Sequence, residues 1–217
     1  MAAYFNLTLD TTAPSGGSIS LPARTGSANV TATLSATGAS YMKLWGDICA
    51  TPGGTAITEA NASWIAYSAS TSIILTSANG TKTVYVRFMD DVGNASTSYN
   101  ATTIYDSSVP TVTIVGPDVA KISKVSGYNV SEFSFSADEA FDEWTVRVVP
   151  STSSTHTAGT QIPTTGGSTN MSGTTQTAAS TAITCTIYGA DLETASAGDG
   201  VKIVKVFVKD LTGNWSV

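Results

Sequence analysis

The chain has 217 residues, with 10 basic and 16 acidic side chains and a formal net charge of −6. This length accommodates two β-sandwiches of about 100 residues, each able to bury its own core. The acidic balance argues against a nucleic-acid surface, which requires clustered Lys and Arg. The sequence contains no run of 18 apolar residues, which is the pattern that would predict a membrane-spanning helix. We therefore expect neither nucleic acid nor a membrane among the partners.

The composition favours strands over helices. Charged residues make up 12% of the chain and aromatic residues 8%, while Ser, Thr, Gly, Ala and Val fill most other positions, which suits short strands and polar turns. No long stretch carries apolar side chains at helical spacing between a capping residue and a terminating Gly. The sequence predicts an all-β protein.

In chain order, the first recurring feature is the peptide Asp-Thr-Thr-Ala-Pro at 10–14, which returns as Asp-Ser-Ser-Val-Pro at 106–110. A repeat of this length corresponds to one sandwich domain. We therefore predict one domain over 1–106, with an N-terminal strand at 4–9, and a second over 107–217. A Ser/Thr/Gly-rich tract at about 151–180 is predicted as a loop insertion in the second domain, either mobile or a binding loop.

Alternating side chains predict matching strands in the two halves. Residues 30–36 and 133–137 alternate between apolar and small polar side chains, the period-2 pattern of a half-buried strand. The next strand of each half is predicted at 41–45 and 143–149. Trp45 and Trp144 lie at similar places in these strands and are predicted to be large core anchors.

A second repeat lies near the end of each half. The apolar run 82–88 leads into Asp90, Gly93 and Asn94, and the run 202–208 leads into the same residues of a second Asp-x-x-Gly-Asn sequence. The nearest approach to a basic cluster, Lys202, Lys205 and Lys209, belongs to this second run. Lysines on a strand commonly protect an edge.

The two cysteines, Cys49 and Cys185, fall in different halves. Neither domain can therefore contain the inter-sheet disulfide of antibody-type domains, and two cysteines provide no paired zinc motif. We predict two free thiols.

The opening at residues 9–14, read together with the Asp-x-x-Gly-Asn turn, resembles the bacterial Ig-like repeats found in tandem in bacterial surface proteins and phage virion proteins. The resemblance covers nearly the whole chain and implies two tandem immunoglobulin-like β-sandwich domains. Such repeats serve as spacers, decorations and adhesins, and the resemblance implies no catalytic residues.

Candidate catalytic groups are few. His156 is the only histidine, and it lies in the low-complexity tract without a carboxylate placed by sequence to orient it. The acidic pairs at 138–139 and 142–143 surround a predicted turn, where solvated carboxylates need no catalytic role. We expect no enzyme activity and no cofactor.

A calcium site is one interpretation of the oxygen-bearing residues at the end of one predicted strand. Asp90, Asp91 and Asn94 offer oxygen ligands and could lie near Asp106 or Asp10. The alternative is a turn that requires no metal, because Gly and Asn tolerate positive φ and Asp can bond its own backbone. We prefer the turn.

The two copies of the repeat differ in the strands that precede and follow them. In the first half, a final strand is predicted at 97–105 after Asn94, whereas only three residues follow Asn214 in the sequence. Residues 4–9 stand before Asp10 as a final strand stands before Asp106. We hypothesise that they add to the second domain of a neighbouring copy or dock on another virion protein, with four partner-binding residues: Tyr4, Phe5, Leu7 and Leu9. Two alternatives are that 4–9 extends the first strand of its own domain, and that the chain is an excerpt of a longer repeat array.

The resemblance and composition lead to an expected function. We expect a phage virion structural protein, a capsid decoration or auxiliary (cement) protein that contacts a major capsid or tail protein and copies of itself. Residues 1–9 lack a signal-peptide pattern, so we expect synthesis in the host cytoplasm and a location on the virion surface. The alternatives are a tail or fibre component, and an adhesin that binds a surface glycan through loops 51–60 and 151–180.

Overall fold

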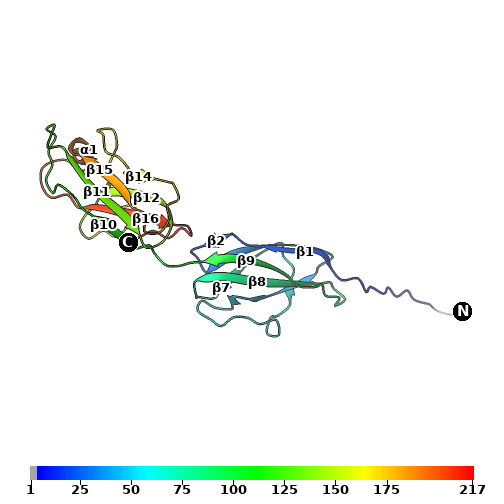
Figure 1. Ribbon diagram of the computed structural model, residues 1–217. Helices are drawn as coiled ribbons and strands as arrows, with labels where there is room; N and C mark the ends of the chain where they lie inside the picture. Colours follow the sequence, from blue (N-terminus) through cyan, green and yellow to red (C-terminus); the bar gives the residue numbers. More distant parts are fainter. Residues whose placement is uncertain (1–3) are drawn as a thin grey trace. The chain divides into compact units, whose positions relative to one another are not determined.

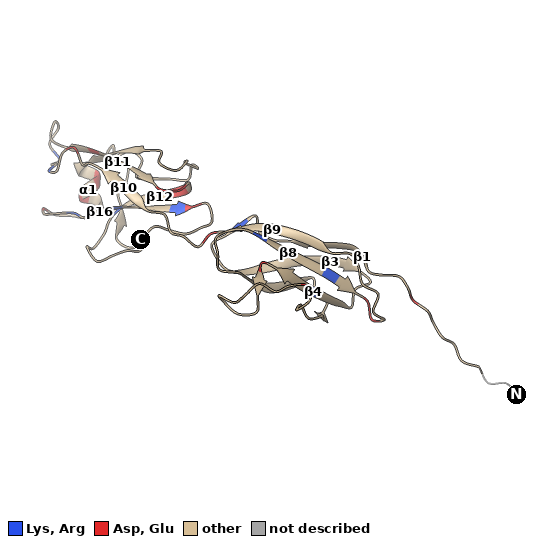
Figure 2. Ribbon diagram, turned by 60° about the horizontal axis from the view of Figure 1, so that its bottom comes forward, with Lys and Arg blue, Asp and Glu red and all other residues tan. Residues whose placement is uncertain are grey.

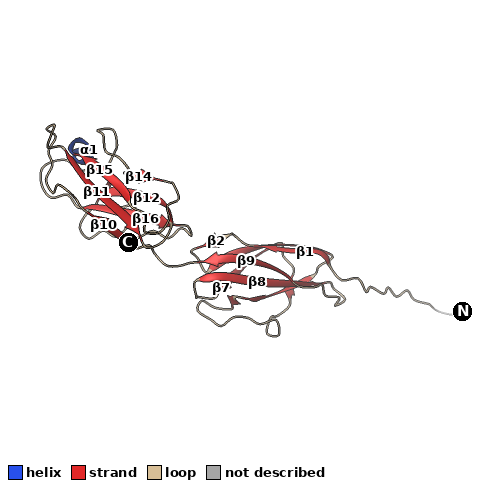
Figure 3. Cartoon of the chain, in the orientation of Figure 1, coloured by secondary structure: helices blue, strands red, loops and turns tan. Residues whose placement is uncertain are grey.

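The computed structural model describes residues 4–217. The chain divides into two compact units, Met1–Ser107 (unit 1) and Ser108–Val217 (unit 2), one residue beyond the predicted boundary. Both are built from strands, with one short helix in unit 2 (Figure 3). The predicted all-β class is confirmed. Charged side chains are few and scattered over the strands and loops of each unit (Figure 2).

Unit 1 is a sandwich of two sheets (Figure 1). The first sheet has the order β1 (Ser15–Ser20), β3 (Asn29–Thr37), β7 (Ser70–Leu75), β5 (Ile48–Cys49). The second has the order β2 (Arg24–Thr25), β9 (Tyr99–Tyr105), β8 (Gly80–Met89), β4 (Tyr41–Gly46), β6 (Ile65–Ala66). Among the described strands of unit 1, only β2 and β9 pair in parallel. Strands that cross between two packed antiparallel sheets are the topology of immunoglobulin-like domains.

The core of unit 1 lies between its two sheets and follows the predicted alternation. In β3, Val30, Ala32 and Leu34 are buried while the Thr and Ser side chains between them are exposed. The predicted strands at 30–36 and 41–45 are confirmed as parts of β3 and β4, and the strand predicted at 97–105 is confirmed as β9, which begins two residues later.

Unit 2 repeats this plan with fewer strands. One sheet has the order β10 (Val112–Val115), β11 (Val130–Ala137), β15 (Ile183–Tyr188). In the other, β12 (Phe141–Val148) pairs with β13 (Thr160–Gln161), β14 (Ser172–Gly173) and β16 (Val204–Asp210). The helix α1 (Gly189–Ala195) follows β15, and no helix in the described part of the chain is long and apolar enough to cross a membrane.

An aromatic cluster forms the centre of the unit 2 core. The rings of Phe135, Phe141 and Trp144 lie with centroids 6.1 to 6.3 Å apart, and Phe133 and Ala137 are buried on the same face of β11. Aromatic pairs at this separation contribute beyond their buried area. Trp144 is therefore a core anchor, as predicted.

Trp45 is also buried, but it does not belong to the core cluster between the sheets of unit 1. Met42 and Leu44 of β4 point into the core, so Trp45 points to the outer face of the sheet, since successive strand residues face opposite sides. There it stacks on Tyr85 with ring centroids 5.6 Å apart. The strand register shows that Trp45 and Trp144 are not equivalent residues. Met42 pairs with Phe88, two residues before Asp90, and Trp144 pairs with Val208, two residues before Asp210, so Trp144 is the equivalent of Met42.

The predicted insertion is folded against the sandwich. Residues 160–161 and 172–173 form the short strands β13 and β14 on β12. Ile162 and Met171 are completely buried in the core of unit 2. The interpretation as a mobile loop is wrong over this stretch, because two isolated apolar residues attach it to the core.

Both cysteines are free and buried, as predicted. Burial raises the pKa of the Cys185 thiol to about 12. A thiol that stays protonated is a poor nucleophile and metal ligand, so Cys185 serves as a small core side chain.

Candidate interaction surface

The free edge of β16 is the main structural difference between the two units. In unit 1, β8 pairs with β4 on one side and β9 on the other. Among residues 4–217, β16 pairs with β12 and, on its other side, only through the bridge between Lys209 and Trp215. Lys205 and Lys209 lie on this edge strand, where the sequence suggested edge protection.

Backbone groups of β16 point toward the open side. The Val208 N–H donates to Ser216 Oγ at 3.0 Å, and the Ser216 N–H donates to the Val208 carbonyl at 2.9 Å. Because hydrogen-bonding directions alternate along a strand, the N–H and C=O groups of Val206 and Val204 face the same side as those of Val208. They are available to an added strand.

An apolar groove, here called the edge groove, runs beside this strand between β10 and β16. A larger part of about 810 Å³ and a smaller part of about 290 Å³ both include Ile114 and Val204 in their walls. The other apolar residues of the larger part include Val119, Ile122, Phe133, Ile187, Val201 and Ile203. The groove therefore opens between the two sheets where a closing strand would pack.

Apolar side chains around the edge groove are unusually exposed. Among the residues in its wall, Val201 is 95% exposed, Val119 46% and Ile114 45%. Exposed apolar residues that form a continuous group mark an interaction surface, unlike single scattered ones. The edge groove is therefore the candidate interaction surface of unit 2.

The four predicted partner-binding residues lie in the extended segment 4–9. Tyr4, Phe5, Leu7 and Leu9 are between 85% and 91% exposed and belong to no strand. The alternative that this segment extends the first strand of unit 1 is wrong, because β1 begins at Ser15. The described contact next to the segment is made at Asp10, whose carbonyl accepts a hydrogen bond from Asn94 Nδ2 at 3.2 Å.

The four calcium candidates are not brought together in unit 1. Asp90 follows the last residue of β8, whereas Asp106 follows β9, whose last residue pairs with the first residue of β8. The 10-residue strand β8 separates the two carboxylates by roughly 30 Å at about 3.3 Å per residue. Asp91 is exposed. The proximity of Asp90 to Asp106 that the sequence suggested is wrong, because the two residues flank opposite ends of β8.

The Asp90 carboxylate closes a turn. Its Oδ1 accepts the N–H groups of Val92 at 3.0 Å and Asn94 at 2.8 Å, and its Oδ2 accepts Asn94 Nδ2 at 2.7 Å. Burial raises the pKa of Asp90, but the hydrogen bonds from Asn94 and Val92 outweigh it and hold the pKa below the ordinary value. This is the geometry that the turn interpretation expects.

Unit 2 builds the same turn. Asp210 Oδ1 accepts the N–H groups of Thr212 at 2.7 Å and Asn214 at 2.8 Å, and Oδ2 accepts Asn214 Nδ2 at 2.7 Å. The carboxylate is 2% exposed. The Asp-x-x-Gly-Asn sequence therefore forms the same set of hydrogen bonds in both units.

We predict that Asp210→Ala lowers the free energy of unfolding of unit 2 by about 1–3 kcal/mol, because it removes the acceptor of two turn N–H groups. Urea denaturation measures the change. The exposed Asp199→Ala is the control, and equal stability of the two variants would contradict the structural role of the turn.

Three of the other candidate catalytic groups, His156, Asp138 and Glu143, have structural partners. His156 stacks on Trp215, with centroids 4.1 Å apart and planes 6° apart. The hydrogen bond from the Thr111 N–H to Asp138 Oδ1, 2.8 Å long, lowers the pKa of that carboxyl. Glu143 forms an ion pair with Lys209, and its hydrogen bond raises the pKa of the Lys209 ammonium group.

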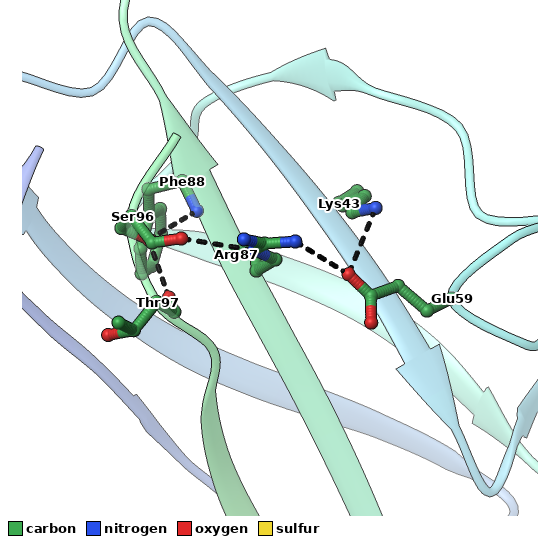
Figure 4. A network of polar contacts seen from close by, with 6 residues as sticks. All are labelled: Lys43, Glu59, Arg87, Phe88, Ser96 and Thr97. Carbon is green, nitrogen blue, oxygen red and sulfur yellow. Dashed lines mark hydrogen bonds and ion pairs between the residues drawn. The ribbon is translucent and has the colours of Figure 1, made fainter. Parts of the chain in front are cut away.

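The loop at 51–60, a candidate glycan loop, is held on the outer face of unit 1. Glu59 Oε1 lies 2.8 Å from Arg87 Nη1 and 3.3 Å from Lys43 Nζ (Figure 4). The hydrogen bond from Arg87 is the main cause that lowers the pKa of Glu59. Arg87 also donates to the Ser96 carbonyl, so the network connects this loop with strand β8 and the turn after it.

The second candidate glycan loop, 151–180, is held by a buried carboxylate on α1. Asp191 accepts the N–H groups of Gly166 at 2.6 Å and Ser168 at 2.9 Å and the Thr165 hydroxyl at 3.4 Å. No local pattern in the sequence indicates a role for Asp191, because its partners lie 23 to 26 residues away.

No family model matches the chain, and no curated protein matches it. Solved structures are similar to it at low identity. The fibronectin(III)-like modules of Clostridium thermocellum CbhA share 14% identity over 92% of this chain and 89% of theirs, with a TM-score of 0.42. The D00–D0 domain of intimin shares 14% over 92% and 98%, with a TM-score of 0.33. The chitinase ChiA74 of Bacillus thuringiensis shares 13% over 93% and 30%, with a TM-score of 0.34.

Strand order and sheet packing define the class of the protein. It consists of tandem β-sandwich units of the immunoglobulin-like kind. Within that class, its particular feature is a second unit whose described residues leave one sheet edge open beside an apolar groove.

Proposed function

We propose that this chain is a non-enzymatic structural protein of a bacteriophage particle, an auxiliary protein that decorates the capsid surface. The observation that carries the proposal is the open edge of β16 beside the edge groove. An exposed edge with apolar side chains is a surface for strand addition from another chain. Assembly through such contacts is what a structural protein requires.

Two further observations support this function. The paired motifs of the repeat resemble tandem Ig-like repeats that occur in virion proteins. In addition, buried carboxylates in the structure accept backbone N–H groups and so close a turn at Asp90 and hold a loop at Asp191. The partners would be a major capsid or tail protein, at the virion surface after synthesis in the host cytoplasm.

A surface glycan is the second candidate ligand. It is favoured by the aromatic side chains on the outer face of unit 1, where Lys43 Nζ lies 5.6 Å from the Trp45 ring and 5.2 Å from the Trp64 ring. Aromatic rings on a sheet face can stack on sugars, although Trp45 is itself mostly covered by its neighbours.

Fractionation of the source culture tests the proposal. We expect the chain to sediment with purified particles in many copies per particle, and antibody labelling to place it on capsids. Labelling confined to tails would favour the tail or fibre alternative. Retention on cell-envelope polysaccharide, with none of the chain on particles, would overturn the proposal in favour of the glycan-binding adhesin.

A further inference from the structure

The exposed segment 4–9 has the sequence position of a closing strand. In unit 1, β9 ends at Tyr105, directly before the Asp-Ser-Ser-Val-Pro copy of the repeat, and 4–9 ends directly before the first copy. Aligning the two copies places Phe5 at the position of Ala101 and Leu9 at that of Tyr105. Tyr105 is buried in the core and Ala101 packs against it.

The side-chain pattern of the segment agrees with this alignment. Alternate residues of a strand face the same side, so Phe5, Leu7 and Leu9 would share the face that β9 turns to its core. Asn6 and Thr8 would share the outer face. The segment therefore offers three large apolar side chains on one face, and all three are exposed in the structure.

The open edge of β16 matches the edge that β9 covers. In unit 1, the Phe88 N–H donates to Ser96 Oγ at 3.1 Å, as the Val208 N–H does to Ser216 Oγ in unit 2. The equivalent residues before them, Val86 and Val84, pair with β9. Val206 and Val204 present the same positions without a strand partner on that side among the described residues.

We propose that residues 4–9 of one copy add as an antiparallel strand along residues 200–205 of a second copy, the segment that leads into and begins β16, and insert Phe5, Leu7 and Leu9 into its edge groove. The register follows from β9, in which Ala101 pairs with Val84 and Thr103 with Lys82. Phe5 is thus opposite Val204, and Leu7 opposite Lys202. This inference rests on the proposed structural function and names the partner as the protein itself.

Sedimentation velocity of the 217-residue protein over a range of concentrations tests the proposal. We expect a concentration-dependent series of oligomers. Leu7→Asp places a charge on the inserted face and is expected to weaken association at least tenfold. The matched control Thr8→Asp places the same charge on the outer face and is expected to associate like the unmodified chain.

A mixing experiment separates donor from acceptor. Ile114→Asp, at a side chain 45% exposed in the groove wall, blocks the acceptor. Each variant alone is expected to be monomeric, whereas an equimolar mixture of Leu7→Asp and Ile114→Asp is expected to form one-to-one dimers. Circular dichroism and thermal melting confirm that both variants are folded.

The register is tested by Leu7→Cys on one copy and Lys202→Cys on another, which are expected to form a disulfide between copies under oxidising conditions. Monomers at all concentrations would overturn the proposal, as would a disulfide that forms only within one chain when both cysteines are present in it. Association that survives Leu7→Asp but not Ile114→Asp would show that another segment fills the groove. The result of the co-sedimentation experiment with particles, which tests the proposed function, does not depend on these outcomes.

Discussion

Phe88→Ala is expected to lower the free energy of unfolding of unit 1 by about 3–5 kcal/mol, the range for removing a buried aromatic ring from a packed core. Phe88 is completely buried. Its ring lies 5.8 Å from that of Tyr67 in an edge-on arrangement and 6.0 Å from that of Tyr99. Because a domain is stable by only about 5–15 kcal/mol, the variant is expected to be partly unfolded well below the melting temperature of the unmodified unit.

Hydrogen exchange read by mass spectrometry measures this effect separately for each unit. Exchange is expected to rise in peptides of β3, β4, β8 and β9 and to stay unchanged in β11, β12 and β15, because each unit has its own core. Thr102→Ala, at an exposed position on β9, is the control. Equal loss of protection in both units would contradict independent cores.

Asp191→Ala is expected to lower the free energy of unfolding of unit 2 by about 2–4 kcal/mol, because it leaves the N–H groups of Gly166 and Ser168 without their acceptor. The carboxylate is 1% exposed, so water cannot fully replace it. Asp191→Asn retains one acceptor oxygen and is expected to lose less. Thermal unfolding at pH 7 measures both, and Asp199→Ala is the control on an exposed acid.

The same residue predicts a pH dependence. Burial raises the pKa of Asp191, but hydrogen bonds from Ser168, Gly166 and Thr165 outweigh it, and the pKa lies below the ordinary value of 3.8. The carboxylate therefore stabilises unit 2 above about pH 4, and this contribution is lost as the pH falls through the folded-state pKa. Asp191→Ala is expected to lose less stability between pH 5 and pH 2 than the unmodified protein. An equal loss in both would contradict the assignment.

Local patterns in the sequence predicted much of the fold. The alternation at 30–36 and 133–137 was sufficient because small polar residues separate the apolar ones, so only one face of each strand can be buried. The Asp-x-x-Gly-Asn sequence predicted its turn because all of the hydrogen bonds lie within five residues.

Features that depend on distant residues could not be predicted in this way. Leu44 and Trp45 are adjacent and both apolar, so the pattern does not show which one enters the core. Ile162 and Met171 are isolated in a polar tract, and their burial depends on β12, which is distant in sequence. The separation of Asp90 from Asp106 depends on the pairing of β8 with β9.

The hydroxyl of Ser216 has a consequence for the geometry of any joint made at the open edge of β16. It occupies the position beside Val208, as Ser96 does beside Phe88, so an arriving strand cannot pair at Val208. Such a limit at one end of the edge restricts slippage of the register, to which weakly specified strand pairs are prone. Every joint formed there would have the same spacing and the same polarity, a requirement for a regular surface lattice.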